Sequence, residues 1–287
     1  MSINNKLLED ELTEFCQSDS LSEDGVRAII ERHGAAPNNN DPSIDYKFFH
    51  SACDNESVTE GILRCLVEYF PNAVKAIGEE GRSPLHSICR DNKNVTLGMV
   101  QILIDAFPES LRHENNDGRA PLHCLCRNND LDGESGLKIL ELLIMRCPES
   151  VKHTTKEDGD LPIHFAAAWQ SLEFCRILIE AYPGSERITC GDDEGYLPFH
   201  LACHFNNIAT AKYLYNLYPE SINVATNRGA YPIHFTIAIE EKSNPATAVE
   251  IVQFLLDCDP MWYCRSIKTS FRSIGFAWRQ QMIILTG

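Results

Sequence analysis

Basic residues are scarce in this chain of 287 residues. Lysine and arginine total 25 against 41 aspartate and glutamate residues, which gives a formal charge of -16. A charge of this sign repels the phosphates of nucleic acids and the headgroups of anionic lipids. We therefore expect no nucleic acid among the partners of this protein.

Long apolar runs are also missing. No stretch approaches the ~18 uncharged apolar residues that a membrane-spanning helix needs. The segment from Met1 to Glu11 lacks the basic flank and the apolar run of a secretory signal. We expect a cytoplasmic protein, or else a nuclear one. The twelve cysteines are then free thiols, because a reducing compartment does not maintain disulfides.

Signatures of catalysis are absent as well. The chain has no Gly-x-Ser-x-Gly turn, no His-Glu-x-x-His pair and no glycine-rich phosphate loop after a strand. The sequence therefore predicts neither an enzyme nor a bound cofactor. Its 44% hydrophobic content is normal for a protein with a packed core.

What the chain does have is an internal repeat. A Pro-apolar-His triplet occurs five times, and a sixth copy, Lys47-Phe48-Phe49-His50, keeps only the histidine. The spacings of 36, 37, 41, 36 and 34 residues are typical of stacked helical units. The recurring histidines are His50, His86, His123, His164, His200 and His234.

A leucine and a proline mark the end of each unit. The six prolines are Pro71, Pro108, Pro148, Pro183, Pro219 and Pro260, and the leucines five residues before them are Leu66, Leu103, Leu143, Leu178, Leu214 and Leu255. Each leucine, with the apolar or cysteine residue before it, predicts the buried stripe of an amphipathic helix. The proline then stops that helix. Glycine with asparagine or aspartate between the units predicts turns.

Gly-x-x-Pro-Leu-His, followed by a small-residue helix and a leucine-bearing helix, resembles the ankyrin repeat over residues 45–260. The resemblance implies an all-α solenoid of about seven helix-turn-helix repeats joined by hairpin-like turns. Residues 1–44 then form a degenerate N-terminal capping repeat, residues 45–260 six ankyrin-like repeats, and residues 261–287 a C-terminal tail or irregular cap.

Two features depart from the ankyrin pattern. An aromatic residue with proline replaces the usual Gly-Ala ending in most units. Of the residues before the five Pro-apolar-His prolines, only Ser83 has a side-chain oxygen that suits a helix N-cap. The sequence leaves open how the other helix starts satisfy their backbone groups.

The tail, residues 261–287, is basic and aromatic, with four basic residues and no acidic one. Three interpretations remain: a helix that docks on the sixth repeat, a membrane-surface or self-binding segment, and the stub of a longer protein. We expect docking, because a stack would otherwise expose the core of its last repeat.

Cysteine follows the histidine by three residues in four copies, at Cys53, Cys89, Cys126 and Cys203. Zinc would need four converging ligands, whereas repeats packed as helices stand about 10 Å apart. The ankyrin pattern places a small buried residue here, and we predict that these thiols pack in the core. The resemblance also implies that the histidines brace neighbouring backbone. The densest set, His123, Cys124, Cys126 and Cys147, is kept as an alternative thiol or metal centre.

The resemblance implies a concave groove lined by the first helices and by turns that project as fingers. Groove candidates are Arg90, Arg127, Trp169, His204 and Phe205. The alternative for the aromatic residues is that they cover the edge of the core. Acidic finger tips are predicted at Glu79, Glu80, Asp117, Asp158, Asp160, Asp192, Asp193 and Glu194. Such a row would attract a basic peptide or domain; its alternative role is to keep the protein soluble.

The function that these observations favour is a monomeric scaffold or adaptor that binds a partner protein through the groove and fingers. One alternative is a regulatory ankyrin module of a longer protein. The less favoured alternative is the thiol or metal centre.

Overall fold

The computed structural model describes residues 3–36, 44–191, 194–237 and 245–259. Within this part of the chain fourteen α-helices form seven pairs, and there is no strand. The first helices are α1 (Ile3–Cys16), α3 (Lys47–Asp54), α5 (Pro84–Asp91), α7 (Pro121–Arg127), α9 (Pro162–Trp169), α11 (Pro198–His204) and α13 (Pro232–Ile237). The second helices are α2 (Glu23–Arg32), α4 (Glu60–Tyr69), α6 (Leu97–Ala106), α8 (Gly133–Arg146), α10 (Leu172–Ala181), α12 (Ile208–Leu217) and α14 (Pro245–Cys258).

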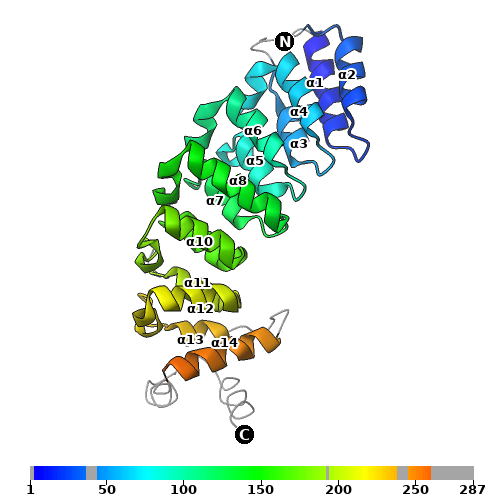
Figure 1. The fold of residues 1–287 in the computed structure, drawn as a ribbon. Coiled ribbons are helices and arrows are strands. Elements are labelled where there is room, and N and C mark those ends of the chain that lie inside the picture. Colours follow the sequence, from blue (N-terminus) through cyan, green and yellow to red (C-terminus); the bar gives the residue numbers. More distant parts are fainter. Residues whose placement is uncertain (1–2, 37–43, 192–193, 238–244, 260–287) are drawn as a thin grey trace.

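The pairs stack in the order of the sequence. First helices contact first helices, as α5 contacts α3 and α7, and second helices contact second helices, as α6 contacts α4 and α8. The result is an elongated, curved array with α1 and α14 at opposite ends (Figure 1). The predicted all-α solenoid of about seven repeats is confirmed. The pair α1 and α2 packs on α3 and α4, as a capping repeat would, whereas residues 261–287 lie outside the described residues.

The buried stripe of the second helices is where the leucines predict it. All six leucines are at most 2% exposed. Six of the seven second helices, α2, α4, α6, α8, α10 and α12, also start with side-chain caps, which fix where each of them begins. The capping residues, whose side chains accept a backbone N–H from the first turn, are Ser22, Thr59, Thr96, Asp132, Ser171 and Asn207.

Four of the prolines that end the second helices also start a 3-10 helix. Proline suits the first position of a helix because it has no N–H to satisfy there. Four of these turns are five residues long: η1 (Pro71–Lys75), η3 (Pro108–Arg112), η4 (Pro148–Lys152) and η6 (Pro219–Asn223). A shorter one, η5 (Ser185–Arg187), follows Pro183. The sequence predicts the helix stop but not the turn that follows it.

Each 3-10 helix leads into a finger, the segment before the next first helix. The described residues of the fingers are 76–83, 113–120, 153–161, 188–191 with 194–197, and 224–231, and the first finger contains η2 (Glu79–Gly81). A backbone hydrogen bond closes each one, as where the N–H of Asn115 donates to the carbonyl of Arg119 at 3.0 Å. The N–H of Asn116 also donates to Glu80 in the preceding finger at 2.9 Å. The predicted hairpin-like turns are therefore present and linked to one another.

Among the described residues, no helix combines the length and the apolar character needed to cross a membrane.

Candidate functional site

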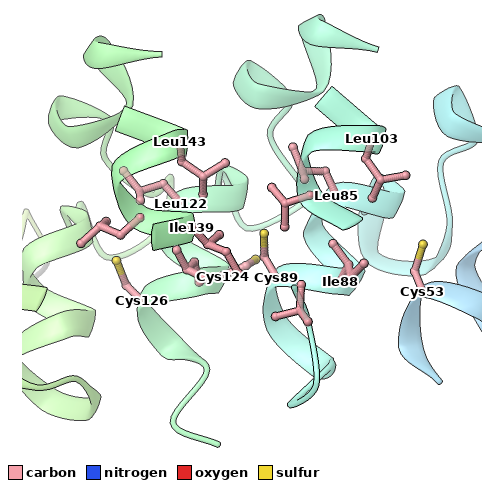
Figure 2. Close-up of a cluster of buried hydrophobic side chains, with 14 of the residues drawn as sticks. Cys53, Leu85, Ile88, Cys89, Leu103, Leu122, Cys124, Cys126, Ile139 and Leu143 are labelled. Atoms are coloured by element: carbon pink, nitrogen blue, oxygen red, sulfur yellow. The ribbon is translucent and has the colours of Figure 1, made fainter. Parts of the chain in front are cut away.

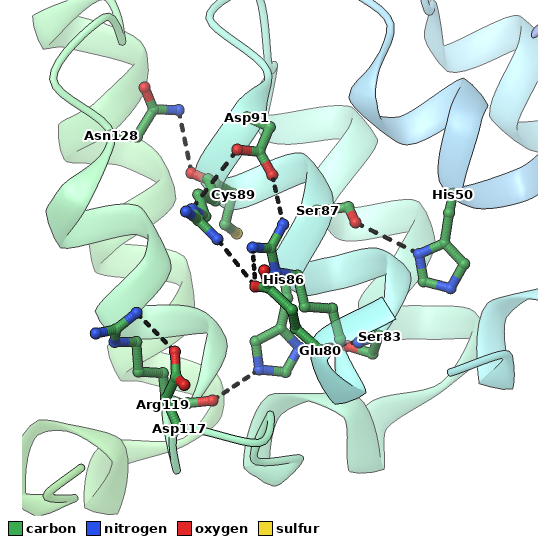
Figure 3. Close-up of polar contacts among 12 residues, drawn as sticks. His50, Glu80, Ser83, His86, Ser87, Cys89, Asp91, Asp117, Arg119 and Asn128 are labelled. Carbon is green, nitrogen blue, oxygen red and sulfur yellow. Dashed lines mark hydrogen bonds and ion pairs between the residues drawn. The ribbon is translucent and has the colours of Figure 1, made fainter. Parts of the chain in front are cut away.

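The recurring histidines cap the first helices and join adjacent repeats. In five repeats the ring Nδ1 accepts the backbone N–H of the residue before the proline, at 2.8 to 3.2 Å. In the first five of the six copies Nε2 lies 2.9 to 3.1 Å from a carbonyl oxygen of the finger that leads into the next repeat. Figure 3 shows this bond from His86 to Arg119. A ring that accepts at Nδ1 and donates at Nε2 is a neutral imidazole.

This arrangement answers the question left open by the helix starts. Ala120, Leu161 and Leu197 have no polar side chain, and the histidine three residues later binds their backbone N–H instead. In a capping box the side chain of a glutamate at this position usually binds that N–H, and here the histidine ring takes its place. At Ser83 the hydroxyl also lies 2.7 Å from Nδ1 of His86. Ser83 is thus not the only residue before a Pro-apolar-His triplet whose backbone N–H has a capping partner.

Burial keeps these histidines uncharged. It lowers the pKa of His86 to about 4, of His123 to about 3 and of His200 to about 4, because an imidazolium would lose its water there. A histidine whose two nitrogens both bind backbone has no lone pair left for a metal and no proton to exchange with a substrate. The bracing role that the resemblance implies is confirmed.

The recurring cysteines are core residues. Cys53, Cys89, Cys126 and Cys203 are fully buried, and Figure 2 shows three of them among leucine and isoleucine side chains. Burial raises the pKa of Cys89 and Cys126, and it raises that of Cys124 to about 12. A thiol with such a pKa is a poor nucleophile. The prediction of packing is confirmed.

The alternative thiol or metal centre is not assembled. The described residues contain no group of three or more histidine, cysteine, aspartate or glutamate side chains placed to hold a metal ion. Both ring nitrogens of His123 bind backbone, one to Ala120 and one to His153. The placement of His123, Cys124, Cys126 and Cys147 in sequence therefore does not produce a ligand set in space.

The chain itself neutralises part of the acidic finger row. Glu80 pairs with Arg82, and Arg90 lies 3.6 Å from the same carboxylate. Asp117 pairs with Arg119 at 2.8 Å, and Figure 3 shows these contacts. Arg90, predicted as a groove residue, is thus already engaged by a finger. These carboxylates attract an incoming cation less than their number in the sequence suggests.

The remaining finger acids differ among themselves. Glu194 pairs with Arg228, and Asp160 lies 3.9 Å from Nδ1 of His164, which is neutral while it accepts a backbone N–H. Glu79 and Asp158 form no ion pair with another described residue. Two further predicted tips, Asp192 and Asp193, lie outside the described residues.

An exposed aromatic pair stands at the C-terminal ends of two first helices. Trp169, the last residue of α9, is 39% exposed and Phe205, just after α11, is 38% exposed. Their ring centroids are 4.2 Å apart, and the ring of His204 lies 4.8 Å from Phe205. The rings therefore pack on each other, yet more than a third of each residue faces water.

Arg90 and Arg127 occupy the corresponding ends of α5 and α7, and Arg127 is exposed. Because α5, α7, α9 and α11 contact one another in turn, the five predicted groove residues form one row along the stack. We call this row the first-helix surface: Arg90, Arg127, Trp169, His204 and Phe205.

Comparison with known proteins supports the same architecture. A family model described as ankyrin repeats in three copies matches residues 131–227. Residues 131–227 therefore contain ankyrin repeats. Among solved structures, the ankyrin-repeat domain of Bcl-3, described as a unique member of the IkappaB protein family, superposes with a TM-score of 0.53. That match has 14% sequence identity and covers 86% of this chain and 97% of the other, so it shows the fold. No curated protein sequence matches.

A ladder of side-chain amides joins adjacent repeats of the stack, and sequence reasoning missed it. The amide of Asn92 donates to the carbonyls of Cys53 and Asn55 in the preceding repeat, at 3.2 and 2.9 Å. Figure 3 shows the amide of Asn128 reaching Cys89. The sequence holds the signal, an amide residue five to seven positions after each of the first five recurring histidines. Its members are Asn55, Asn92, Asn128, Gln170 and Asn207.

Proposed function

We propose that this protein binds a partner protein through its first-helix surface and the adjoining fingers, as a monomeric scaffold or adaptor. The observation that supports the proposal most is the exposed pair of Trp169 and Phe205. Two aromatic rings that face water at one place gain free energy when a partner covers them. Tryptophan and arginine are also the residue types that dominate measured binding energies.

Charge supports a basic segment on that partner. The chain has a formal charge of -16, and Glu79 and Asp158 in the fingers have no ion pair with a described residue. An acidic surface with unpaired carboxylates speeds the approach of a basic partner and loses this advantage in salt. The aromatic pair would then supply most of the affinity, and the carboxylates most of the orientation.

Affinity capture tests the proposal. The tagged chain is incubated with cell lysate, and bound proteins are quantified by mass spectrometry for the natural protein and for Trp169→Ala/Phe205→Ala. We expect at least one specifically retained protein to fall about tenfold or more in the double variant, since two anchors are worth over 1.4 kcal/mol.

The matched control is Met145→Ala, which removes an apolar side chain that is 67% exposed on the second helix α8. It should retain the same proteins as the natural chain. Equal retention by the double variant would refute the proposed surface. A separate comparison with Glu79→Ser/Asp158→Ser should show weaker capture at low salt and little difference at high salt.

A further inference from the structure

Basic residues and aromatic rings alternate along the side of the stack where the second helices end. Four of the five 3-10 helices that follow a proline, η1, η3, η4 and η5, have a basic residue at their last position. In three cases that residue lies against the aromatic ring before the next proline. The pairs are Lys75 with Phe107 at 5.9 Å, Lys152 with Tyr182 at 5.8 Å and Arg187 with Tyr218 at 4.7 Å from the ring centroid. Contacts of this kind are cation–π interactions.

One of these basic residues has no aromatic ring beside it. Arg112 ends η3 in the basic position, but the residue before the next proline is Cys147. Arg112 forms no ion pair with another described residue. After the last described 3-10 helix, η6, both residues of the pair differ: Asn223 replaces the basic residue, and Asp259 replaces the aromatic residue before the next proline. Among the described repeats, Arg112 is thus the one basic residue at the end of such a 3-10 helix that has no aromatic ring beside it.

A cavity of about 230 Å³ opens at this step. Its floor is buried and mostly apolar: Ile104, Leu111 and Cys147 are at most 8% exposed. Its rim has the exposed Arg112 and Arg146, with Arg146 held 3.3 Å from Asp105. An apolar cavity of ~150 Å³ holds a benzene molecule. The space is therefore large enough for a phenyl, phenol or indole ring.

We propose that this cavity receives an aromatic side chain of a partner protein, whose ring replaces the one missing at Cys147 and lies against Arg112. The neighbouring repeats show the arrangement that the partner would complete. The site lies at the C-terminal ends of α6 and α8 and shares no residue with the first-helix surface. The inference therefore does not rest on the proposed function.

Two short peptides that differ only in the ring test this site. The probes are acetyl-Gly-Gly-Phe-Gly-Gly-amide and its leucine counterpart, and binding to the full chain is followed by saturation-transfer NMR. A single ring gives weak binding, with a Kd of about 1 mM. We expect the leucine peptide to bind at least fivefold more weakly. Equal binding of the two peptides, or no binding of either, would overturn the proposal.

Substitutions at the ring position make the test specific. Cys147→Phe restores the ring and should weaken binding of the phenylalanine peptide at least tenfold, whereas Cys147→Ser should leave it unchanged. Tyr182→Cys opens the equivalent space beside Lys152 and should add a second binding site. If a folded Cys147→Phe variant bound the phenylalanine peptide as tightly as the natural chain does, the peptide would bind outside this cavity, which would contradict the proposal. If that variant does not fold, Arg112→Gln is measured instead, with a threefold to tenfold loss expected and no loss opposing the proposal.

Further measurements test whether something other than a partner protein fills the cavity. Trp169→Ala/Phe205→Ala should bind the phenylalanine peptide as the natural chain does, so failure of the groove proposal and failure of this one are distinguishable. Sedimentation that shows a dimer lost in Cys147→Phe would assign the cavity to a second copy of the chain. Peptide binding that appears only in Trp262→Ala/Trp278→Ala would assign it to the chain's own tail. Either result would overturn the assignment to a partner protein.

Discussion

The rings of His86 and His113 lie edge to face, 5.6 Å apart, across the junction of two repeats. Nε2 of His86 lies 2.9 Å from the carbonyl of Arg119 in the following repeat, and Nε2 of His113 lies 2.9 Å from the carbonyl of Gly81 in the preceding one. His123 and His153 repeat the exchange one junction later. Each of these junctions is therefore hydrogen-bonded in both directions.

His123→Ala should destabilise the protein by about 2 to 4 kcal/mol. The substitution leaves the N–H of Ala120 and the carbonyl of His153 without their ring partner and opens space in the core. Urea unfolding measures the loss. The control is Arg127→Ala, an exposed position on the same helix, where a change under about 0.5 kcal/mol is expected. Equal midpoints for the two variants would contradict the bracing role.

Stability should fall as the pH drops from about 6.5 towards 4. The pKa of His86, His123 and His200 is about 4, 3 and 4 in the folded chain, against about 6.5 when unfolded. Between these values the unfolded chain binds more protons, so acid favours it, by up to about 1.4 kcal/mol per pH unit for each histidine. Asp54, whose pKa burial raises to about 6, opposes this trend.

Urea midpoints at pH 7.0, 5.5 and 4.5 check the pH dependence. They should decrease in that order, and less steeply in His123→Gln/His200→Gln, which removes two of the titrating groups. A midpoint that stays constant or rises towards pH 4.5 would show that these histidines are not buried in their neutral form.

Asn92→Ala should cost about 1 to 3 kcal/mol, because one buried and one partly buried carbonyl of the preceding repeat lose their donor. The neighbouring Asn94 is exposed and makes one amide bond, to the carbonyl of Glu56. Asn94→Ala should therefore cost less than about 0.5 kcal/mol. Thermal unfolding of the two variants at one pH compares them, and a similar loss in both would argue against an amide ladder.

Gly159→Ala should be more harmful than Gly229→Ala. Both glycines have positive φ, +63° and +77°, which costs alanine about 1 to 2 kcal/mol. At Gly159 the added Cβ would also stand 2.6 Å from the backbone of Gly191 in the next finger, whereas nothing lies within 4 Å at Gly229. We expect a total loss of about 3 kcal/mol or more at Gly159, measured by urea unfolding. Equal losses would mean that the fingers can separate freely.

The sequence predicts the stack well because its recurring residues have one physical role each. A leucine such as Leu178 is recognised by its place in an amphipathic period, and a proline such as Pro108 by the helix that it ends. The sequence does not predict the amide ladder, because Asn92 and Asn128 resemble ordinary loop residues. Their role is visible only when the carbonyls of the preceding repeat lie beside them in the structure. Hydrogen bonds between residues 36 to 45 positions apart cannot be read from local pattern.

The proposed binding surface is less predictable for the same reason. The sequence gives the charge of Glu80 and Asp117 but not their arginine partners, which lie close only after folding. It places Trp169 and Phe205 at equivalent positions, yet their mutual contact and remaining exposure depend on how adjacent repeats pack. The cavity beside Cys147 depends on a ring that is missing, and only comparison between folded repeats reveals it.

Hydrogen exchange of the chain with and without a captured partner tests most directly whether the first-helix surface binds protein. We expect partner binding to slow exchange in peptides that cover residues 162–170 and 198–207, which contain Trp169 and Phe205, and in the adjoining fingers. The second helices should exchange as before. Protection confined to the second helices, with none over α9 and α11, would contradict the proposed binding surface.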